Sequence, residues 1–272
     1  MKFPKAHCQT PLTYVFDLDG VIYRGVEPQP HAKETVLTLR EQGHIVRFYT
    51  NNSALSREAY SVRLEEFGIP TPVDEIMTSS YATALYFIEH NAIGKTVYKI
   101  GEEGVTDELE AVGMRMIGNG DDPNAHVDYV VVGIDRQFNY DKLARAQHAI
   151  LSGAKFIATN EDLTYPTEGG TVVPGNGSLV AAVRAATSVE PVVIGKPHGY
   201  ALTKILEMTN TPRECAYMVG DNLATDIAAG NRAGIHSVLV LTGLTTREMA
   251  DKAAGELKPE IVIDTLAELV AG

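Results

Sequence analysis

The stretch LTYVFDLDG, residues 12–20, is an apolar run that ends abruptly in two aspartates and a glycine. A short apolar run of this kind is typical of a strand buried in a parallel sheet. Such a strand would deliver Asp17 and Asp19 to the carboxyl edge of the sheet, where open α/β sheets bind their ligands. Gly20 permits a tight turn directly afterwards. An ordinary Asp-Gly turn has the same sequence, so this stretch alone leaves both interpretations open.

Strands and helices alternate on both sides of this stretch. Apolar runs predict strands at 12–16, 45–49, 192–194, 216–219 and 237–241, and helical spacing with end signals predicts helices at 31–42, 56–67, 200–208, 224–233 and 264–271. This alternation is typical of an α/β protein with a parallel sheet. We therefore expect a Rossmann-like parallel sheet as the core of the fold.

The middle of the chain carries a second set of elements. Strands are predicted at 96–100, 129–133 and 156–158, helices at 105–112 and 140–152, and a loop rich in Gly, Pro and Thr at 160–177. The chain has 272 residues, just under two domains of roughly 150 residues each. We expect a discontinuous core at 1–80 and 190–272 and an inserted α/β domain at 81–189.

Composition and charge exclude several classes of protein. Hydrophobic residues make up 44% and charged residues 21%, which is ordinary for a globular chain. The formal charge of −12 argues against a nucleic acid polymer as the partner but allows a small anion held by a metal. No apolar run approaches the ~20 residues that cross a bilayer, and the first dozen residues lack the apolar region of a signal peptide. No membrane partner is expected.

The chain contains two cysteines, Cys8 and Cys215, which lie far apart in the sequence. This pair does not form the framework of closely spaced cysteines that is typical of small secreted domains. We therefore expect no disulfide, an inert Cys8 and a reducing, cytoplasmic location.

A second acidic motif follows another predicted strand. In the sequence GDNLATD, residues 220–226, Asp221 would lie at the same sheet edge as Asp17, and Asp226 could point back from the first turns of the next helix. Several carboxylates at one edge repel each other unless a cation compensates them, and Mg²⁺ prefers such oxygen ligands. Alternatively, Asp226 is simply a negative charge near a helix N-terminus, where the helix dipole favours it.

Two further polar motifs also follow predicted strands. Thr50, which precedes Asn51 and Asn52, would offer a hydroxyl group and backbone amides to a phosphoryl oxygen. Lys196, in the sequence Gly-Lys-Pro, would offer a positive charge to a phosphate and to a carboxylate nucleophile. Taken alone, a turn asparagine and a surface lysine are the more common interpretations.

Taken in order, these four motifs resemble those of the haloacid dehalogenase superfamily, whose members transfer phosphoryl groups through an aspartate nucleophile. The sequence DLDGVIY at 17–23, together with TNN at 50–52, is similar to the NagD branch. That branch includes nitrophenyl, phosphoglycolate, nucleotide and sugar phosphate phosphatases. Its members insert a large α/β cap between the second and third motifs, where this chain has its predicted inserted domain.

The resemblance implies a role for each motif residue. Asp17 would be the nucleophile that forms an aspartyl phosphate, and Asp19 the general acid and base. Mg²⁺ would be held by Asp17, by the backbone carbonyl of Asp19 and by Asp221. Phosphoryl oxygens would be held by Thr50, Asn51 and Lys196, and supporting roles would fall to Asn222 and to Asp226, which would orient a metal-bound water or Lys196.

The resemblance also makes the inserted domain the part that selects the substrate. In the loop at 160–177, the expected contacts to the leaving group are Asn160, Asp162 and Tyr165. It is equally consistent with the sequence that Tyr165 packs within the inserted domain and does not contact the leaving group. The presence of Asp19 favours a phosphatase over a dehalogenase, which would lack this second carboxylate.

The predicted function is therefore Mg²⁺-dependent hydrolysis of small-molecule phosphate monoesters, such as sugar, polyol, aryl, glycolate or nucleotide phosphates. We expect a monomer or a homodimer. Two alternatives stay open at this stage. One is a phosphotransferase that passes the same phosphoryl group to an acceptor other than water. The other is a non-catalytic ligand-binding protein on this fold.

Overall fold

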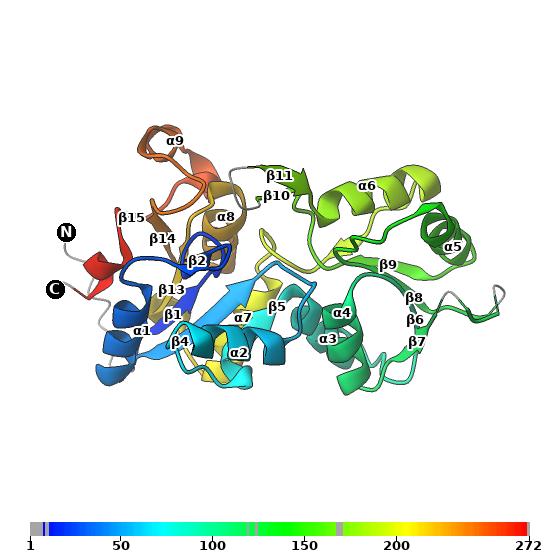
Figure 1. Cartoon of the computed structure of the whole chain (residues 1–272), viewed down its shortest axis with the longest axis horizontal. Helices are drawn as coiled ribbons and strands as arrows, with labels where there is room; N and C mark the ends of the chain where they lie inside the picture. Colours follow the sequence, from blue (N-terminus) through cyan, green and yellow to red (C-terminus); the bar gives the residue numbers. More distant parts are fainter. Residues whose placement is uncertain (1–7, 9–10, 119, 123–124, 167–170, 271–272) are drawn as a thin grey trace. The chain divides into compact units, whose positions relative to one another are not determined.

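The computed structural model describes residue 8 and residues 11–118, 120–122, 125–166 and 171–270 (Figure 1). The chain divides into two compact units. Unit 1 comprises the residues up to Thr50, Tyr60–Met77 and the residues from Lys196 onward, and unit 2 comprises Asn51–Ala59 and Thr78–Gly195. The expected boundaries at 80 and 190 differ from these by a few residues. A larger difference is that residues 51–59 pack with unit 2, although the sequence placed them in the core.

Unit 1 is built on a six-stranded sheet with the order β15-β14-β13-β1-β4-β5. Its strands are β1 (Thr13–Phe16), β4 (Ile45–Thr50), β5 (Ile76–Thr78), β13 (Ala216–Gly220), β14 (His236–Val240) and β15 (Ile261–Ile263). The neighbouring pairs from β15 through to β4 are all parallel. Strand β1 is buried along its whole length at the centre of this sheet, which confirms the expected parallel α/β core.

Helices cover both faces of the unit 1 sheet. On one face, α1 (Ala32–Glu41) and α2 (Arg57–Glu66) contribute Leu39 and Leu64 to a core that also contains Phe16 of β1. On the other face, α8 (Ala228–Ala233) packs so closely that Gly230 lies against Met218 of β13. Successive strand residues point to opposite faces, which is why Met218 meets α8 while its neighbours join the first core. Helix α7 (Tyr200–Thr209) packs against α8.

Unit 2 has its own five-stranded parallel sheet with the order β12-β9-β8-β6-β7. Its strands are β6 (Thr96–Ile100), β7 (Arg115–Ile117), β8 (Tyr129–Val132), β9 (Lys155–Ala158) and β12 (Val192–Val193). Its helices are α3 (Ser79–Glu89), α4 (Glu103–Ala111), α5 (Tyr140–Leu151) and α6 (Asn176–Thr187). Figure 1 shows α5 and α6 on one face of this sheet and α3 and α4 on the other.

Several short elements complete the chain. They are the hairpins β2 (Tyr23–Arg24) with β3 (Glu27–Pro28) and β10 (Thr164–Pro166) with β11 (Val172–Pro174), helix α9 (Arg247–Lys252), a π turn at Leu223–Ile227, and 3₁₀ turns at Val73–Glu75, Arg213–Cys215, Gly255–Leu257 and Leu266–Leu269. The hairpin β10–β11 replaces part of the loop expected at 160–177, whose residues 167–170 lie outside the described part of the chain. The final helix expected at 264–271 is the short 3₁₀ turn at Leu266–Leu269, and Ala271 also lies outside the described residues.

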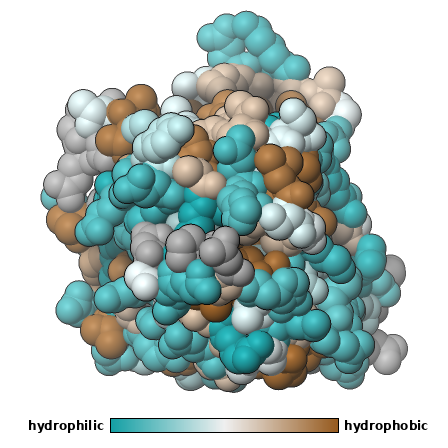
Figure 2. All heavy atoms as spheres, turned by 90° about the vertical axis from the view of Figure 1, so that its right-hand side faces the viewer, coloured by the Kyte–Doolittle hydropathy of each residue, from teal (hydrophilic) through white to brown (hydrophobic). Residues whose placement is uncertain are grey.

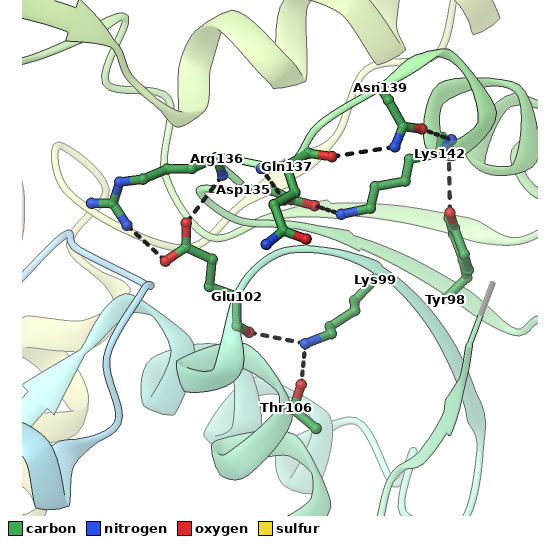
Figure 3. Close-up of polar contacts among 9 residues, drawn as sticks. All are labelled: Tyr98, Lys99, Glu102, Thr106, Asp135, Arg136, Gln137, Asn139 and Lys142. Carbon is green, nitrogen blue, oxygen red and sulfur yellow. Dashed lines mark hydrogen bonds and ion pairs between the residues drawn. The ribbon is translucent and has the colours of Figure 1, made fainter.

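Polar contacts join the two loops that follow β6 and β8 in unit 2 (Figure 3). Arg136, in the loop after β8, forms an ion pair of 2.7 Å with Glu102, in the loop after β6. Lys142 of α5 donates to Asp135 at 2.6 Å, and both of these side chains are largely buried. Lys99 of β6 donates to the carbonyl of Glu102 at 3.0 Å. These bonds fix the two loops against each other at the carboxyl edge of the unit 2 sheet.

The face drawn in Figure 2 is mixed in character. Hydrophilic residues cover much of it, and groups of hydrophobic residues lie between them. Among the described residues, no helix combines the length and the apolar character needed to span a bilayer.

The two cysteines form a disulfide, which corrects the expectation of two separate thiols. Cys8 and Cys215 are 207 positions apart in the sequence, yet their Cα atoms are 5.9 Å apart. The pairing of β1 with β13 explains this proximity. Thr13 lies opposite Ala216, the residue that follows Cys215, and Cys8 is only five positions before Thr13. Sequence separation alone cannot exclude a disulfide when a sheet brings the two segments together.

We predict that this disulfide stabilises the folded protein by about 2–4 kcal/mol, because it removes conformational freedom from the unfolded chain. Urea denaturation with and without a reducing agent measures the effect. Cys8→Ser should lower the unfolding midpoint by the same amount as reduction, and reduction should not affect this variant further. Two titratable thiols in the unreduced, denatured wild-type protein would contradict the disulfide and restore the expectation of a reducing compartment.

Candidate active site

The candidate site of unit 1 lies at the carboxyl ends of three adjacent parallel strands. Asp17 follows β1, Thr50 is the last residue of β4, and Asp221 follows β13. The backbone N–H of Asp17 donates to the carbonyl of Val219 at 2.9 Å and so continues the pairing of β1 with β13. The three side chains are therefore delivered to the same sheet edge, and each of these residues is less than 9% exposed.

Lys196 joins this group through two short ion pairs. Its Nζ donates to Asp17 Oδ1 and to Asp226 Oδ1, both at 2.6 Å, and it lies 3.4 Å from the carbonyl oxygen of Tyr49. Burial alone would lower the pKa of Lys196, but Asp17 and Asp226 outweigh it and raise the pKa above its ordinary value. The ammonium group therefore stays charged and links the first acidic motif to the second.

Three buried carboxylates converge beside this ammonium group. Ligand oxygens of Asp17, Asp221 and Asp226 lie within 4.8 Å of one another. Burial raises the pKa of Asp17 well above its ordinary value, and the charges of Asp226 and Asp221 raise it further against the opposing effect of Lys196. Burial and then the charge of Asp226 raise the pKa of Asp221 to about 7. The site holds more negative charge than Lys196 compensates.

This excess charge is what a bound cation would neutralise. The donor set consists of carboxylate oxygens, which are the ligands that Mg²⁺ prefers in proteins. The raised pKa values of Asp17 and Asp221 show that, without a cation, these carboxyl groups hold protons more tightly than usual. The residues present therefore fit a magnesium ion.

Asp221 is held in place by the backbone of the segment that follows β14. The N–H of Leu244 donates to Asp221 Oδ2 at 2.7 Å. A Cβ atom on Gly243 would lie 1.8 Å from the same oxygen, so only glycine fits there. Sequence reasoning missed Gly243 and Leu244, although a Thr-Gly pair at the end of an apolar strand is a usable signal of this contact.

Asp19 lies in the turn that follows Asp17. Its neighbour Gly20 has a φ of +88°, and the Gly20 N–H donates to the carbonyl of Tyr23 at 2.7 Å, which closes the turn. Asp19 is partly exposed, whereas Asp17 is buried. The two carboxyl groups thus differ in their access to water.

Asp226 and Asn222 organise the loop after β13. Asp226 is 1% exposed, and its Oδ2 accepts from the backbone N–H of Asn222 at 3.1 Å while its Oδ1 accepts from Lys196. The side chain of Asn222 accepts from the N–H of Ala224 at 2.9 Å and so caps the following turn. Asp226 therefore contacts both Lys196 and the backbone of Asn222.

The other predicted residues belong to unit 2. Asn51 is its first residue, joined by a peptide bond to Thr50, and its side-chain amide donates to Asp162 Oδ2 at 3.0 Å. Asn160 is 3% exposed and donates to the backbone carbonyl of Asn51 at 2.7 Å. Tyr165 lies on β10, opposite Val173 of β11, and is partly buried. The structure thus brings Asn51, Asn160 and Asp162 together.

Comparison with known proteins identifies the family. A haloacid dehalogenase-like hydrolase family matches residues 14–115, and a second family of the same kind matches residues 193–269. The chain is 41% identical to the 5'-nucleotidase YutF of Bacillus subtilis over 94% of this chain and 96% of that protein. It is 38% identical to an acid sugar phosphatase of Staphylococcus saprophyticus over the same shares of the two chains.

A solved structure resembles the whole chain as well. The glycerol phosphate phosphatase of Mycobacterium tuberculosis, solved in complex with magnesium, superposes with a TM-score of 0.88 at 33% identity, covering 96% of this chain and 77% of that one. The matches in sequence, the fold and the order of the motifs all indicate the same family. The chain belongs to the haloacid dehalogenase-like hydrolases, and its motifs and relatives place it in the NagD-like phosphatase branch of that family.

Proposed function

We propose that this protein hydrolyses small-molecule phosphate monoesters through an aspartyl phosphate on Asp17, with Mg²⁺ as its cofactor. The observation that carries this proposal is the position of Asp17. It is buried beside a permanently charged Lys196 and shares its surroundings with Asp221 and Asp226. Relatives that are named as a nucleotidase, an acid sugar phosphatase and a glycerol phosphate phosphatase support the same class of reaction.

In the first step, an oxygen of Asp17 attacks phosphorus, the bond to the leaving oxygen breaks, and Asp19 gives that oxygen a proton. In the second step, Asp19 takes a proton from a water molecule, which attacks the phosphorus and releases Asp17 and inorganic phosphate. Lys196 fixes one oxygen of Asp17 at 2.6 Å, which leaves the other for the attack. Thr50, at the end of the adjacent strand, and Lys196 are suited to bind the phosphoryl oxygens.

Asp17 and Asp221, with the backbone carbonyl of Asp19, would hold the magnesium ion. When bound, the ion supplies positive charge that offsets the charge of the phosphate and of the clustered carboxylates. Asp226 is bonded to Lys196 and to the backbone of Asn222. Its part in this proposal is therefore to orient Lys196.

We further propose that unit 2 selects the leaving group and that the substrates include sugar, polyol, aryl, glycolate or nucleotide phosphates. The relatives support this breadth, because their names describe a nucleotide, a sugar and a glycerol phosphate as substrates. We also propose a monomer or homodimer in the cytoplasm. The disulfide between Cys8 and Cys215 argues against this location, because a reducing cytosol keeps most cysteine pairs reduced, so the count of free thiols tests it.

Replacing Asp17 by Asn should lower phosphate release from p-nitrophenyl phosphate by at least about 10³-fold, because the amide cannot act as the nucleophile. Phosphate release is measured with Mg²⁺ in excess. The matched control is Asp264→Asn, since the Asp264 side chain is 72% exposed and pairs with Arg247 on the surface. The control should retain wild-type activity. Wild-type turnover in Asp17→Asn would exclude Asp17 as the nucleophile.

Magnesium should change the pH dependence of stability. Without metal, the pKa of Asp221 is about 7 in the folded protein and 3.8 in the unfolded chain, so the protonated carboxyl group favours folding. That contribution is complete below about pH 4 and is lost as the pH rises through about 7. Added Mg²⁺ binds the ionised form and should therefore stabilise the protein more at pH 8 than at pH 5.

Thermal unfolding at pH 5 and pH 8, in EDTA and in Mg²⁺, measures this change, with Asp221→Asn as the reference variant. In EDTA, the unfolding midpoint of the wild type should fall relative to that of Asp221→Asn as the pH rises. In Mg²⁺ at pH 8, the wild-type midpoint should rise and that of the variant should not. Equal effects of Mg²⁺ on both proteins would show that the ion binds elsewhere.

A further inference from the structure

The residues that follow Thr50 are held by the carboxyl edge of the unit 2 sheet. The carbonyl of Ala54 accepts from the N–H of Gly104, after β6, at 2.9 Å. The hydroxyl of Ser53 accepts from the N–H of Ile134, after β8, at 2.9 Å. Gly104 lies in the first turn of α4 and Ile134 in the loop after β8, next to the polar contacts drawn in Figure 3. The segment is thus bonded to two elements at the carboxyl edge of the unit 2 sheet.

A buried ion pair holds the far end of the same segment. Both the backbone N–H and the Nε of Arg57 donate to Glu108 of α4 at 3.0 Å. Glu108 is 2% exposed, and the guanidinium of Arg57 lies 3.4 Å from the ring centre of Tyr81. Residues 51–57 are therefore anchored at both ends and along their length.

Asn51, the residue joined to Thr50, is held by two short hydrogen bonds to its backbone carbonyl. Two buried side chains donate to its backbone carbonyl, Ser79 Oγ at 2.6 Å and Asn160 Nδ2 at 2.7 Å. Ser79 is 0% and Asn160 is 3% exposed. A carbonyl oxygen has two acceptor positions, so these two donors satisfy it fully and fix the direction of the peptide group.

Asn160 is itself held from both sides. Its Oδ1 accepts from the backbone N–H of Asp162 at 3.1 Å, and its carbonyl accepts from Asn176 Nδ2 at 2.7 Å. Asn176 is 2% exposed and also donates to the carbonyl of Val132 at the end of β8. Such a connected set of buried bonds gives the Asn160 side chain one orientation, aimed at Asn51.

We propose that Asn160 and Ser79 are positioning residues for phosphoryl transfer, which act by fixing the Asn51–Asn52 peptide group and thereby the backbone of Asn51, the residue that the chain joins to Thr50. This inference rests on the proposed phosphatase function and assigns Asn160 a role other than contact with the leaving group. Preorganised donors stabilise a transition state only when their direction is fixed, and a displacement of about 1 Å can cost about 10²-fold in rate. The effect should therefore be the same for every substrate.

The test compares Asn160→Asp with the wild type. The aspartate has the same shape but turns an oxygen toward the Asn51 carbonyl in place of the N–H donor. We expect kcat/KM to fall by about 10²-fold, by the same factor for p-nitrophenyl phosphate, glycerol phosphate and a mononucleotide. Inhibition by orthovanadate, which has no leaving group, should weaken in parallel. Ser79→Ala removes the second donor and should cause a smaller loss, uniform across the same substrates.

The matched control is Asn139→Asp, which makes the same chemical change in unit 2. Asn139 accepts from the N–H of Lys142 at the start of α5, and aspartate caps a helix equally well, so activity should not change. Circular dichroism and unfolding midpoints show whether each variant is folded. If Asn160→Asp does not fold, Ser79→Ala decides: a uniform loss supports the proposal, and wild-type activity overturns it.

Two other results separate the possible failures. A loss in Asn160→Asp that differs strongly between substrates, with vanadate inhibition unchanged, would make Asn160 a leaving-group contact and overturn the proposal. If the wild-type protein hydrolyses none of the substrates, the proposed function fails instead. Calorimetric titration of vanadate then decides on positioning: binding weakened in both variants supports it, and equal binding in all proteins overturns it.

Discussion

The structure of the site depends on the buried contact between Lys196 and the two aspartates that it joins. Three carboxylates face one ammonium group in a place that excludes most water, so two negative charges are uncompensated when all three are ionised. Unpaired buried charge is costly, and the site must take up protons or a cation. Lys196 opposes the rise in the pKa of Asp17 and holds one of its oxygens at 2.6 Å. The preference for a cation, the raised pKa values of Asp17 and Asp221 and the fixed orientation of the Asp17 side chain all follow from this balance.

The fold makes this concentration of charge tolerable. Strands β1, β4 and β13 are adjacent and parallel, and their buried apolar residues anchor the backbone on which the polar residues stand. The charged groups of the site lie where the strands end and not among the apolar residues of the core. The peptide that leaves β4 at Thr50 enters unit 2 directly at Asn51. The unit that we propose to select the substrate is thus joined by one peptide bond to the strand end that we propose to bind phosphate.

The sequence predicted the parallel core because each of its main strands is a compact apolar run. It also predicted that Asp17 and Asp221 meet at one sheet edge, because each follows such a run. It did not predict contacts that depend on tertiary structure. The bond between Asn160 and Asn51 spans 109 residues, and the disulfide spans 207. Strand β10 was missed because Thr164–Pro166 is only three residues long and ends in proline. The assignment of residues 51–59 to unit 2 depends on buried polar bonds, which leave no periodic signal.

The central claim is that Asp17 is the residue that receives the phosphoryl group. Rapid acid quenching during turnover, followed by proteolysis and mass spectrometry, tests this claim directly because an acyl phosphate survives briefly in acid. We predict one phosphoryl group on the peptide that contains Asp17, present with Mg²⁺ and absent with EDTA. A phosphoryl group on any other residue, or turnover with no covalent intermediate under these conditions, would contradict it.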